Sequence, residues 1–208
     1  MTPGCASPDA WRVSRPFAEV VRARRMVRAY RLDPVDPAAV ERILDAARRA
    51  PSAGFSQGQS FVVVTGEATR TRLAEVCREP AFRARGFAPW VSAAPVLVVP
   101  CVREAAYHER YAEPDKARSV PPRDWPVPFW WVDGGAALML LLLAAVDEGL
   151  AAGFLAADPA GLRAVLGIPA EVTPLGVVTI GQPAADRRSG SLRRGRRPES
   201  EVIHRERW

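Results

Sequence analysis

Apolar side chains recur at helical spacing in two segments near the start of the chain. Between residues 17 and 28 they lie close to a 3.6-residue repeat, which predicts a helix that ends before Pro34. Asp36 suits an N-cap and Pro37 suits the first helical position. The apolar face that follows predicts a second helix, which ends at the turn APSAG of residues 50–54.

Continuous apolar runs indicate the strands. They are rich in β-branched residues and are bounded by glycine or proline, as buried strands are. Three such runs predict strands: 61–65, 94–102 and 174–183. Helical patterns lie between and around them: 67–77, 133–148 and 159–169. Because helices connect strands that are distant in sequence, the pattern predicts an α/β or α+β fold with few strands.

The predicted helix at 133–148 is apolar on nearly all sides, which places it in the centre of the fold or at an interface. Its apolar run at 136–146 is shorter than the roughly 20 residues of a membrane span. The segment 103–131 before it holds five prolines and three tryptophans. Compact domains seldom keep so long an irregular segment unless it serves binding or a subunit interface.

The length of 208 residues fits one domain, with a lead-in at 1–16 and the domain proper at 17–208. The lead-in lacks the apolar core of a secretory signal. Three widely spaced cysteines fit a reducing compartment, so we expect a cytoplasmic protein. The two histidines lie in no cluster of metal ligands, so no metal site is expected.

The formal net charge of +6 favours anionic partners. A bound phosphate requires arginine side chains together with N–H and hydroxyl donors. Three loop or helix-end stretches combine such groups: 22–31, 50–59 and 187–199. Arg24 and Arg28 are four residues apart and would share a helix face, and Ser52 could add its hydroxyl. The alternative is that each stretch is a solvated surface.

Several of these stretches resemble one family. RRMVRAYRLDPVDPAAVERILDAARRAPSAGFSQGQSFVVVT is similar to the opening signature of the nitroreductase family of FMN enzymes, with its R-R-S-x-R-x-(F/Y) motif and its helix that ends in A-P-S. WWVDGGAALMLLLLAAVDEGLAAGF resembles the long central helix of that family. LGIPAEVTPLGVVTIGQPA, followed by RRPESEV, resembles its last strand and its basic C-terminal segment. The similar elements occur in the family's order from about residue 20 to about residue 205.

The resemblance implies an α+β fold of the nitroreductase type, with a central, mainly antiparallel sheet flanked by helices. It also implies an intertwined homodimer with FMN at the interface. Arg24 and Arg25 would then bind the flavin phosphate, and Arg196 and Arg197 would close on it. Arg28 would reach the pyrimidine edge of the flavin, where a cation favours the reduced cofactor.

The resemblance assigns roles to two further pairs of residues. Ser52 would donate a hydrogen bond to the flavin or its ribityl chain, and Gln57 would contact flavin across the dimer. Ala152 and Gly153 would bring backbone N–H groups toward flavin N5, where a small residue permits close approach.

The chain departs from the family pattern at four positions. Met26 replaces the usual phosphate-binding serine, which removes one hydroxyl donor. Phe55, Gly58 and Gln59 stand where the family has Asn, Pro and Trp. We expect FMN binding to survive because several donors share the anion, and we expect substrate choice near the flavin to change.

The implied activity is that of an FMN-dependent NAD(P)H oxidoreductase. It would transfer hydride by a ping-pong mechanism, through flavin N5, to a small acceptor such as a nitroaromatic compound or a quinone. No side chain is assigned as a catalytic acid or base, and the choice between NADH and NADPH stays open. Two alternatives remain. One is different flavin chemistry on this fold, such as dehydrogenation, dehalogenation or deazaflavin use. The other is nucleic-acid binding. It predicts stacking aromatic residues interleaved with the arginines, which the clusters do not show beyond Tyr30.

Overall fold

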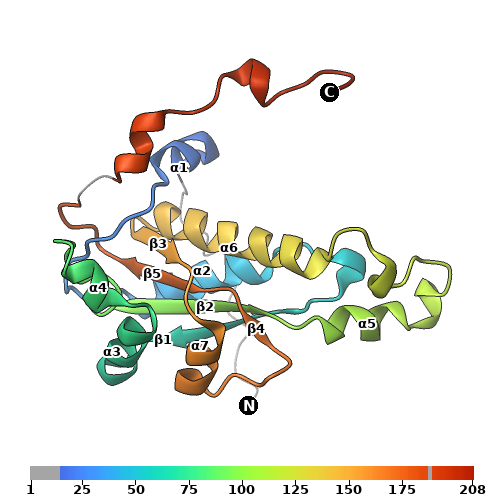
Figure 1. Cartoon of the computed structure of the whole chain (residues 1–208), viewed down its shortest axis with the longest axis horizontal. Coiled ribbons are helices and arrows are strands. Elements are labelled where there is room, and N and C mark those ends of the chain that lie inside the picture. The colour runs from blue at the N-terminus through green and yellow to red at the C-terminus, as the bar shows by residue number, and fades with distance from the viewer. Residues whose placement is uncertain (1–14, 187–188) are drawn as a thin grey trace, which may run out of the picture.

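A computed structural model describes residues 15–186 and 189–208, so nearly all of the lead-in lies outside the described residues. The described chain forms one antiparallel sheet with helices on both faces (Figure 1). The predicted α+β class, with a mainly antiparallel central sheet, is therefore confirmed.

The sheet has five strands in the described chain: β1 (Gln59–Val64), β2 (Val96–Val102), β3 (Ala151–Leu155), β4 (Thr173–Pro174) and β5 (Val177–Gly181). The strand order is β1-β2-β5-β3, and the two-residue β4 pairs with β2 beyond the end of β5. β3 thus forms one edge of the sheet and β1 the other.

Seven α-helices occur in the described chain: α1 (Phe17–Ala23), α2 (Pro37–Arg48), α3 (Glu67–Val76), α4 (Glu79–Arg83), α5 (Ala105–Tyr111), α6 (Phe129–Asp147) and α7 (Pro159–Leu166). Asp36 caps α2 as predicted, because its Oδ1 accepts a hydrogen bond of 3.0 Å from the N–H of Ala38. The described residues also contain five short 3-10 turns, three in connecting segments and two in the C-terminal segment: Ala53–Phe55, Pro114–Lys116, Pro122–Asp124, Gly190–Arg194 and Glu199–Glu201.

Helices on opposite faces of the sheet build two core layers. Along β2, Leu97 and Val99 face a cluster with α3 and α7, whereas Val96 and Val98 face a cluster with α2 and α6. All seven residues of β2 are buried, which explains its unbroken apolar run. The apolar helix expected in the centre of the fold or at an interface corresponds to α6, which packs against both α2 and the sheet.

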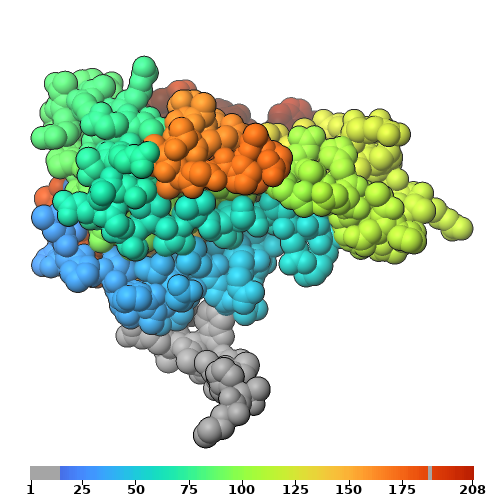
Figure 2. Space-filling model, turned by 90° about the horizontal axis from the view of Figure 1, so that it is seen from below, coloured from blue at the N-terminus to red at the C-terminus, as the bar shows by residue number. Residues whose placement is uncertain are grey.

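Several elements differ from the sequence-based expectation. The first helix ends at Ala23 instead of Arg28, because the chain then runs extended against β3. β3 itself was not expected, since AAGFL has no β-branched residue. The long segment 103–131 contains α5, and α6 begins at Phe129 instead of residue 133. In both views the part of this segment around α5 projects from one end of the body (Figures 1 and 2).

Candidate functional site

The arginine-rich segment 24–31 is fixed along the outer edge of β3. Met26 forms a parallel β-bridge with Ala152, and the N–H of Val27 donates to the carbonyl of Ala152 at 3.1 Å. A few residues later the segment pairs with the chain that follows β5, where the N–H of Arg31 donates to the carbonyl of Gln182 at 2.9 Å. An arginine run that could have been a solvated helix face is therefore built into the sheet.

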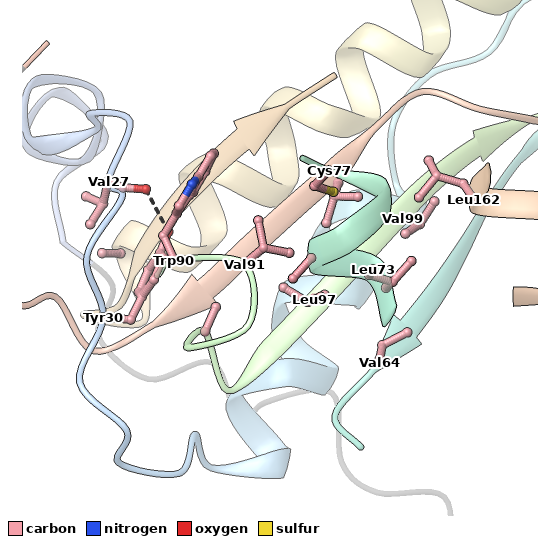
Figure 3. Close-up of a cluster of buried hydrophobic side chains, with 14 of the residues drawn as sticks. Val27, Tyr30, Val64, Leu73, Cys77, Trp90, Val91, Leu97, Val99 and Leu162 are labelled. Carbon is pink, nitrogen blue, oxygen red and sulfur yellow. Dashed lines mark hydrogen bonds between the residues drawn. The ribbon is translucent and has the colours of Figure 1, made fainter. Parts of the chain in front are cut away.

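The side chain of Tyr30 connects this segment to the sheet. Its hydroxyl lies 2.9 Å from the carbonyl oxygen of Val27 and 2.7 Å from Oγ1 of Thr179 on β5. Burial raises the pKa of the Tyr30 hydroxyl, so it remains a neutral hydrogen-bond donor at physiological pH. Figure 3 shows Val27, Tyr30 and Trp90 together at one end of a hydrophobic cluster.

Gly153 on β3 makes the close packing of this segment possible. A Cβ atom at this position would lie 2.3 Å from the carbonyl oxygen of Val27 and 3.0 Å from Oγ1 of Thr179. The chain's own backbone thus occupies the space that a side chain at residue 153 would need. The proposed role of Ala152 and Gly153 at flavin N5 stays a prediction.

The positive charge of the segment is only partly neutralised. Arg25 Nη1 lies 3.2 Å from Oδ2 of Asp186, and the same oxygen accepts a hydrogen bond of 3.1 Å from the backbone N–H of Arg28. The guanidinium of Arg28 lies over the ring of Trp90, 5.6 Å from its centroid. Within residues 15–186 and 189–208, neither Arg24 nor the guanidinium of Arg28 has a carboxylate partner. The segment thus carries more positive charge than Asp186 neutralises, which favours an anionic ligand.

A cleft of about 270 Å³ opens beside the segment. Its lining comes from the arginine segment, from the end of α6 and from the start of β3, and includes Arg25, Val27, Val146, Leu150 and Ala151. One of the predicted phosphate-binding arginines, Arg25, thus borders a hollow surface.

Ser52 and Gln57, the second part of the predicted site, lie in the turn between α2 and β1. Ser52 Oγ accepts a hydrogen bond of 2.9 Å from the N–H of Gln57, which leaves the hydroxyl proton free to donate elsewhere. Gln57 has a φ of 50°, which is uncommon for a residue other than glycine.

The sheet register separates this turn from the arginine segment. Ala152 pairs with Ile180 of β5, which in turn pairs with Val96 at the start of β2. Gln59, just after the turn, pairs with Val102 at the other end of β2. Val96 and Val102 are six steps apart along β2, and at about 3.3 Å a step the two regions lie about 20 Å apart. One protomer therefore does not bring the two parts of the predicted site together.

Arg196 and Arg197 lie in a third place. Both are exposed, and Arg197 donates to the carbonyl oxygen of Glu201 at 2.7 Å and to its carboxylate at 3.2 Å. The segment that carries them runs past α1 and away from the sheet (Figure 1). Within the protomer they do not join the arginine segment.

Three residues that sequence reasoning did not single out support the arginine segment. They are Tyr30, Trp90 and Asp186, which pack beneath it or bind it. Tyr30 occupies the aromatic position of the R-R-S-x-R-x-(F/Y) motif, so that motif could have indicated it. Asp186 lies 158 residues after Arg28, and no local pattern connects the two.

Comparison with known proteins identifies relatives of the chain. The model of the nitroreductase family matches residues 21–182. An NADH dehydrogenase of Thermus thermophilus is 33% identical over 181 residues, covering 78% of this chain and 84% of the relative. An FMN reductase (NAD(P)H) of Bacillus subtilis is 27% identical over 198 residues, covering 90% of this chain and 74% of the relative.

Solved structures show the same fold. Nitroreductase A from Vibrio parahaemolyticus aligns with a TM-score of 0.71 at 22% identity, over 92% of this chain and 76% of that chain. A nitroreductase family protein from Clostridium difficile aligns with a TM-score of 0.70 at 21% identity, over 93% of this chain and all of that chain.

Proposed function

The chain belongs to the nitroreductase family, and we propose that it is an FMN-dependent oxidoreductase. It would transfer hydride by a ping-pong mechanism from NADH or NADPH to a small oxidised acceptor such as a nitroaromatic compound or a quinone. The observation that carries the proposal is the incompletely neutralised arginine segment, which is built into the sheet within the matched region. The FMN and NAD(P)H named in its Bacillus subtilis relative support the same assignment.

The residues of the arginine segment fit the two ends of FMN. Arg24 and Arg25 supply cations for the phosphate, beside a cleft that Arg25 lines. Arg28 has no carboxylate on its guanidinium within the described part of the chain, and the flat face of Trp90 supports it. When bound, FMN would serve as the carrier that accepts hydride from a reduced nicotinamide nucleotide and passes it to the acceptor.

The chain's own residues would bind and orient the reactants. Arg28 would place a positive charge at the pyrimidine edge, where negative charge increases on reduction. Tyr30 and Gly153 would hold that cation at a fixed position beside β3, because both pack against the backbone of residue 27. In this proposal no side chain acts as an acid or base.

We further propose that two copies of the chain form the complete site. The turn with Ser52 and Gln57 lies about 20 Å along β2 from the arginine segment, so it would serve the site of a partner protomer. Large apolar side chains also remain exposed on α6 and in the C-terminal segment: Trp131, Val132, Met139, Leu192, Val202 and Ile203. Burying them between protomers would stabilise a homodimer, with Arg196 and Arg197 in the same segment.

The reaction would take place in the cytoplasm. Cys77 and Cys101 are free and buried in the core, which suits a reducing compartment.

Anaerobic mixing of the purified protein with NADH or NADPH tests the proposed activity. The protein should carry a yellow flavin chromophore that loses its absorbance with at least one of the two donors. Absence of bleaching with either donor contradicts the proposal. A colourless protein that binds DNA, with an affinity that falls steeply with salt, would support nucleic-acid binding instead. Light scattering should give twice the mass of the 22.6 kDa chain.

A further inference from the structure

The turn that leads into β1 contains residues in an unfavourable backbone conformation. Gly54, Phe55 and Gln57 have φ angles of 61°, 59° and 50°. Glycine adopts this left-handed region readily, whereas a side chain with a Cβ atom is strained there. A bulky aromatic residue such as Phe55 is therefore an outlier that costs folding free energy.

Contacts from two helices hold the turn in this conformation. The buried carboxylate of Asp133 on α6 accepts a hydrogen bond of 2.9 Å from the N–H of Ala53 and one of 2.8 Å from the hydroxyl of Tyr107. Arg110 of α5 donates from Nε to the carbonyl of Gly54 at 2.8 Å. These bonds lie within one protomer, so the chain itself holds the backbone of Ala53 and Gly54 in place.

Phe55 contributes little to the packing of its own protomer. Its side chain is 73% exposed, and it stacks on no other aromatic ring among residues 15–186 and 189–208. By contrast, the nearby rings of Tyr111 and Trp125 pack on each other edge to face, with centroids 4.9 Å apart. Phe55 instead borders a cleft of about 500 Å³ together with Gln57 and Gly58.

A strained and exposed aromatic residue on a rigid turn indicates a functional role, because strain of this kind persists where a site uses it. We propose that Phe55 determines acceptor specificity: its ring stacks on a planar aromatic acceptor in the site of the partner protomer. The inference rests on the proposed function and on the proposed homodimer. The ring face offers apolar surface and an aromatic quadrupole, which favour a quinone or nitroaromatic ring over a compact ion. Because the turn is preformed, little conformational entropy is lost on binding.

Substitution by asparagine separates this role from a structural one. Asparagine adopts the left-handed region more easily than phenylalanine, so Phe55→Asn should raise the Tm of the flavin-loaded protein by about 2–4 °C. The same change should raise the KM for benzoquinone about fivefold, because the stacking contact is lost. Turnover with ferricyanide, which has no ring to stack, should not change. Phe55→Tyr keeps the ring and should restore the KM.

Direct binding provides a readout that does not depend on turnover. 4-Nitrobenzoate can be titrated into the oxidised flavoprotein, where it binds without reacting, and followed by the change in flavin absorbance. Phe55→Asn should raise its Kd about fivefold. Leu32→Asn is the matched control, because Leu32 is also a large apolar side chain, 82% exposed. It should change neither the KM nor the Kd.

Two results would overturn the inference. One is an unchanged Kd for 4-nitrobenzoate in Phe55→Asn. The other is a lower Tm or a weaker dimer in that variant, which would mean that Phe55 packs in the interface. Failure of the proposed function is distinguishable, because a wild-type protein that does not couple NADH or NADPH oxidation to ferricyanide would contradict it directly.

Discussion

Substitution of Gly153 by alanine tests whether close packing on β3 sets the position of the arginine segment. The added Cβ would lie 2.3 Å from the carbonyl oxygen of Val27 and 3.2 Å from the hydroxyl of Tyr30. The backbone at residue 27 cannot give way as a flexible side chain would, because its N–H and its carbonyl are both hydrogen-bonded. We therefore expect the whole segment to move off β3.

The expected cost has two contributions. Overpacking by one methyl group in a closely packed site typically destabilises a protein by about 1–3 kcal/mol. Movement of the segment also weakens the hydrogen bond between Val27 and Ala152, at about 0.5–1.5 kcal/mol. For a chain of this length each kcal/mol lowers the Tm by about 2–4 °C, so we expect a Tm lower by roughly 3–18 °C.

The change should also weaken FMN binding, because Arg28 would lose its fixed position. Differential scanning fluorimetry gives the Tm, and quenching of flavin fluorescence on titration of FMN gives the Kd. Gly66→Ala is the control, since a Cβ at Gly66 meets no atom within 4 Å. A Gly153→Ala protein with unchanged Tm and unchanged Kd would refute the argument from packing.

Three further predictions concern single groups. Arg28→Ala should weaken FMN binding roughly tenfold or more, since it removes a charged donor, and an unchanged Kd in the same titration would show that Arg28 does not bind the cofactor. Tyr30→Phe should lower the free energy of unfolding by about 1–3 kcal/mol in urea denaturation, because buried acceptors lose their donor. Burial raises the pKa of the Cys77 thiol from 9.0 to about 12 and that of Cys101 to about 11. In a Cys5→Ser variant, Ellman's reagent at pH 8 should therefore label the folded protein only slowly and the protein in guanidinium fully. The unfolded thiols lose their protons near pH 9, whereas the folded thiols keep theirs to higher pH. The free energy of unfolding should therefore fall as the pH rises from about 9 toward 12.

Local signals were sufficient for much of the fold. The cap at Asp36 and the apolar run of β2 depend on neighbours in sequence, and both occur where the pattern predicted them. β3 was missed because its residues are small for a tertiary reason, namely the close contact of Gly153 with the arginine segment. The same contact ends α1 at Ala23, since the residues after it pair with β3 instead of continuing the helix.

In the candidate site, too, some features follow from local sequence and others only from tertiary contacts. The arginines could be assigned from their resemblance to a family motif, but the helix face expected for Arg24 and Arg28 was wrong, because this segment is extended. The anchor formed by Asp133 joins residues 80 positions apart in sequence, so only the folded chain reveals that Ala53 is held. The Phe55 departure was visible in the sequence, whereas its backbone strain was not.

The carboxylate of Asp186 lies beside Arg25 and Arg28, which would bind an anion, and it cancels part of their positive charge. The two contacts of this carboxylate differ in how much they contribute to stability. The ion pair with Arg25 is partly solvated, since the arginine side chain is 51% exposed, and such pairs contribute about 0–1 kcal/mol. The hydrogen bond from the N–H of Arg28 reaches a carboxylate whose side chain is only 6% exposed, and a bond to a charged group contributes about 1.5–3 kcal/mol. Asp186 therefore acts mainly on the backbone, where it fixes residue 28 and leaves the guanidinium free for a ligand.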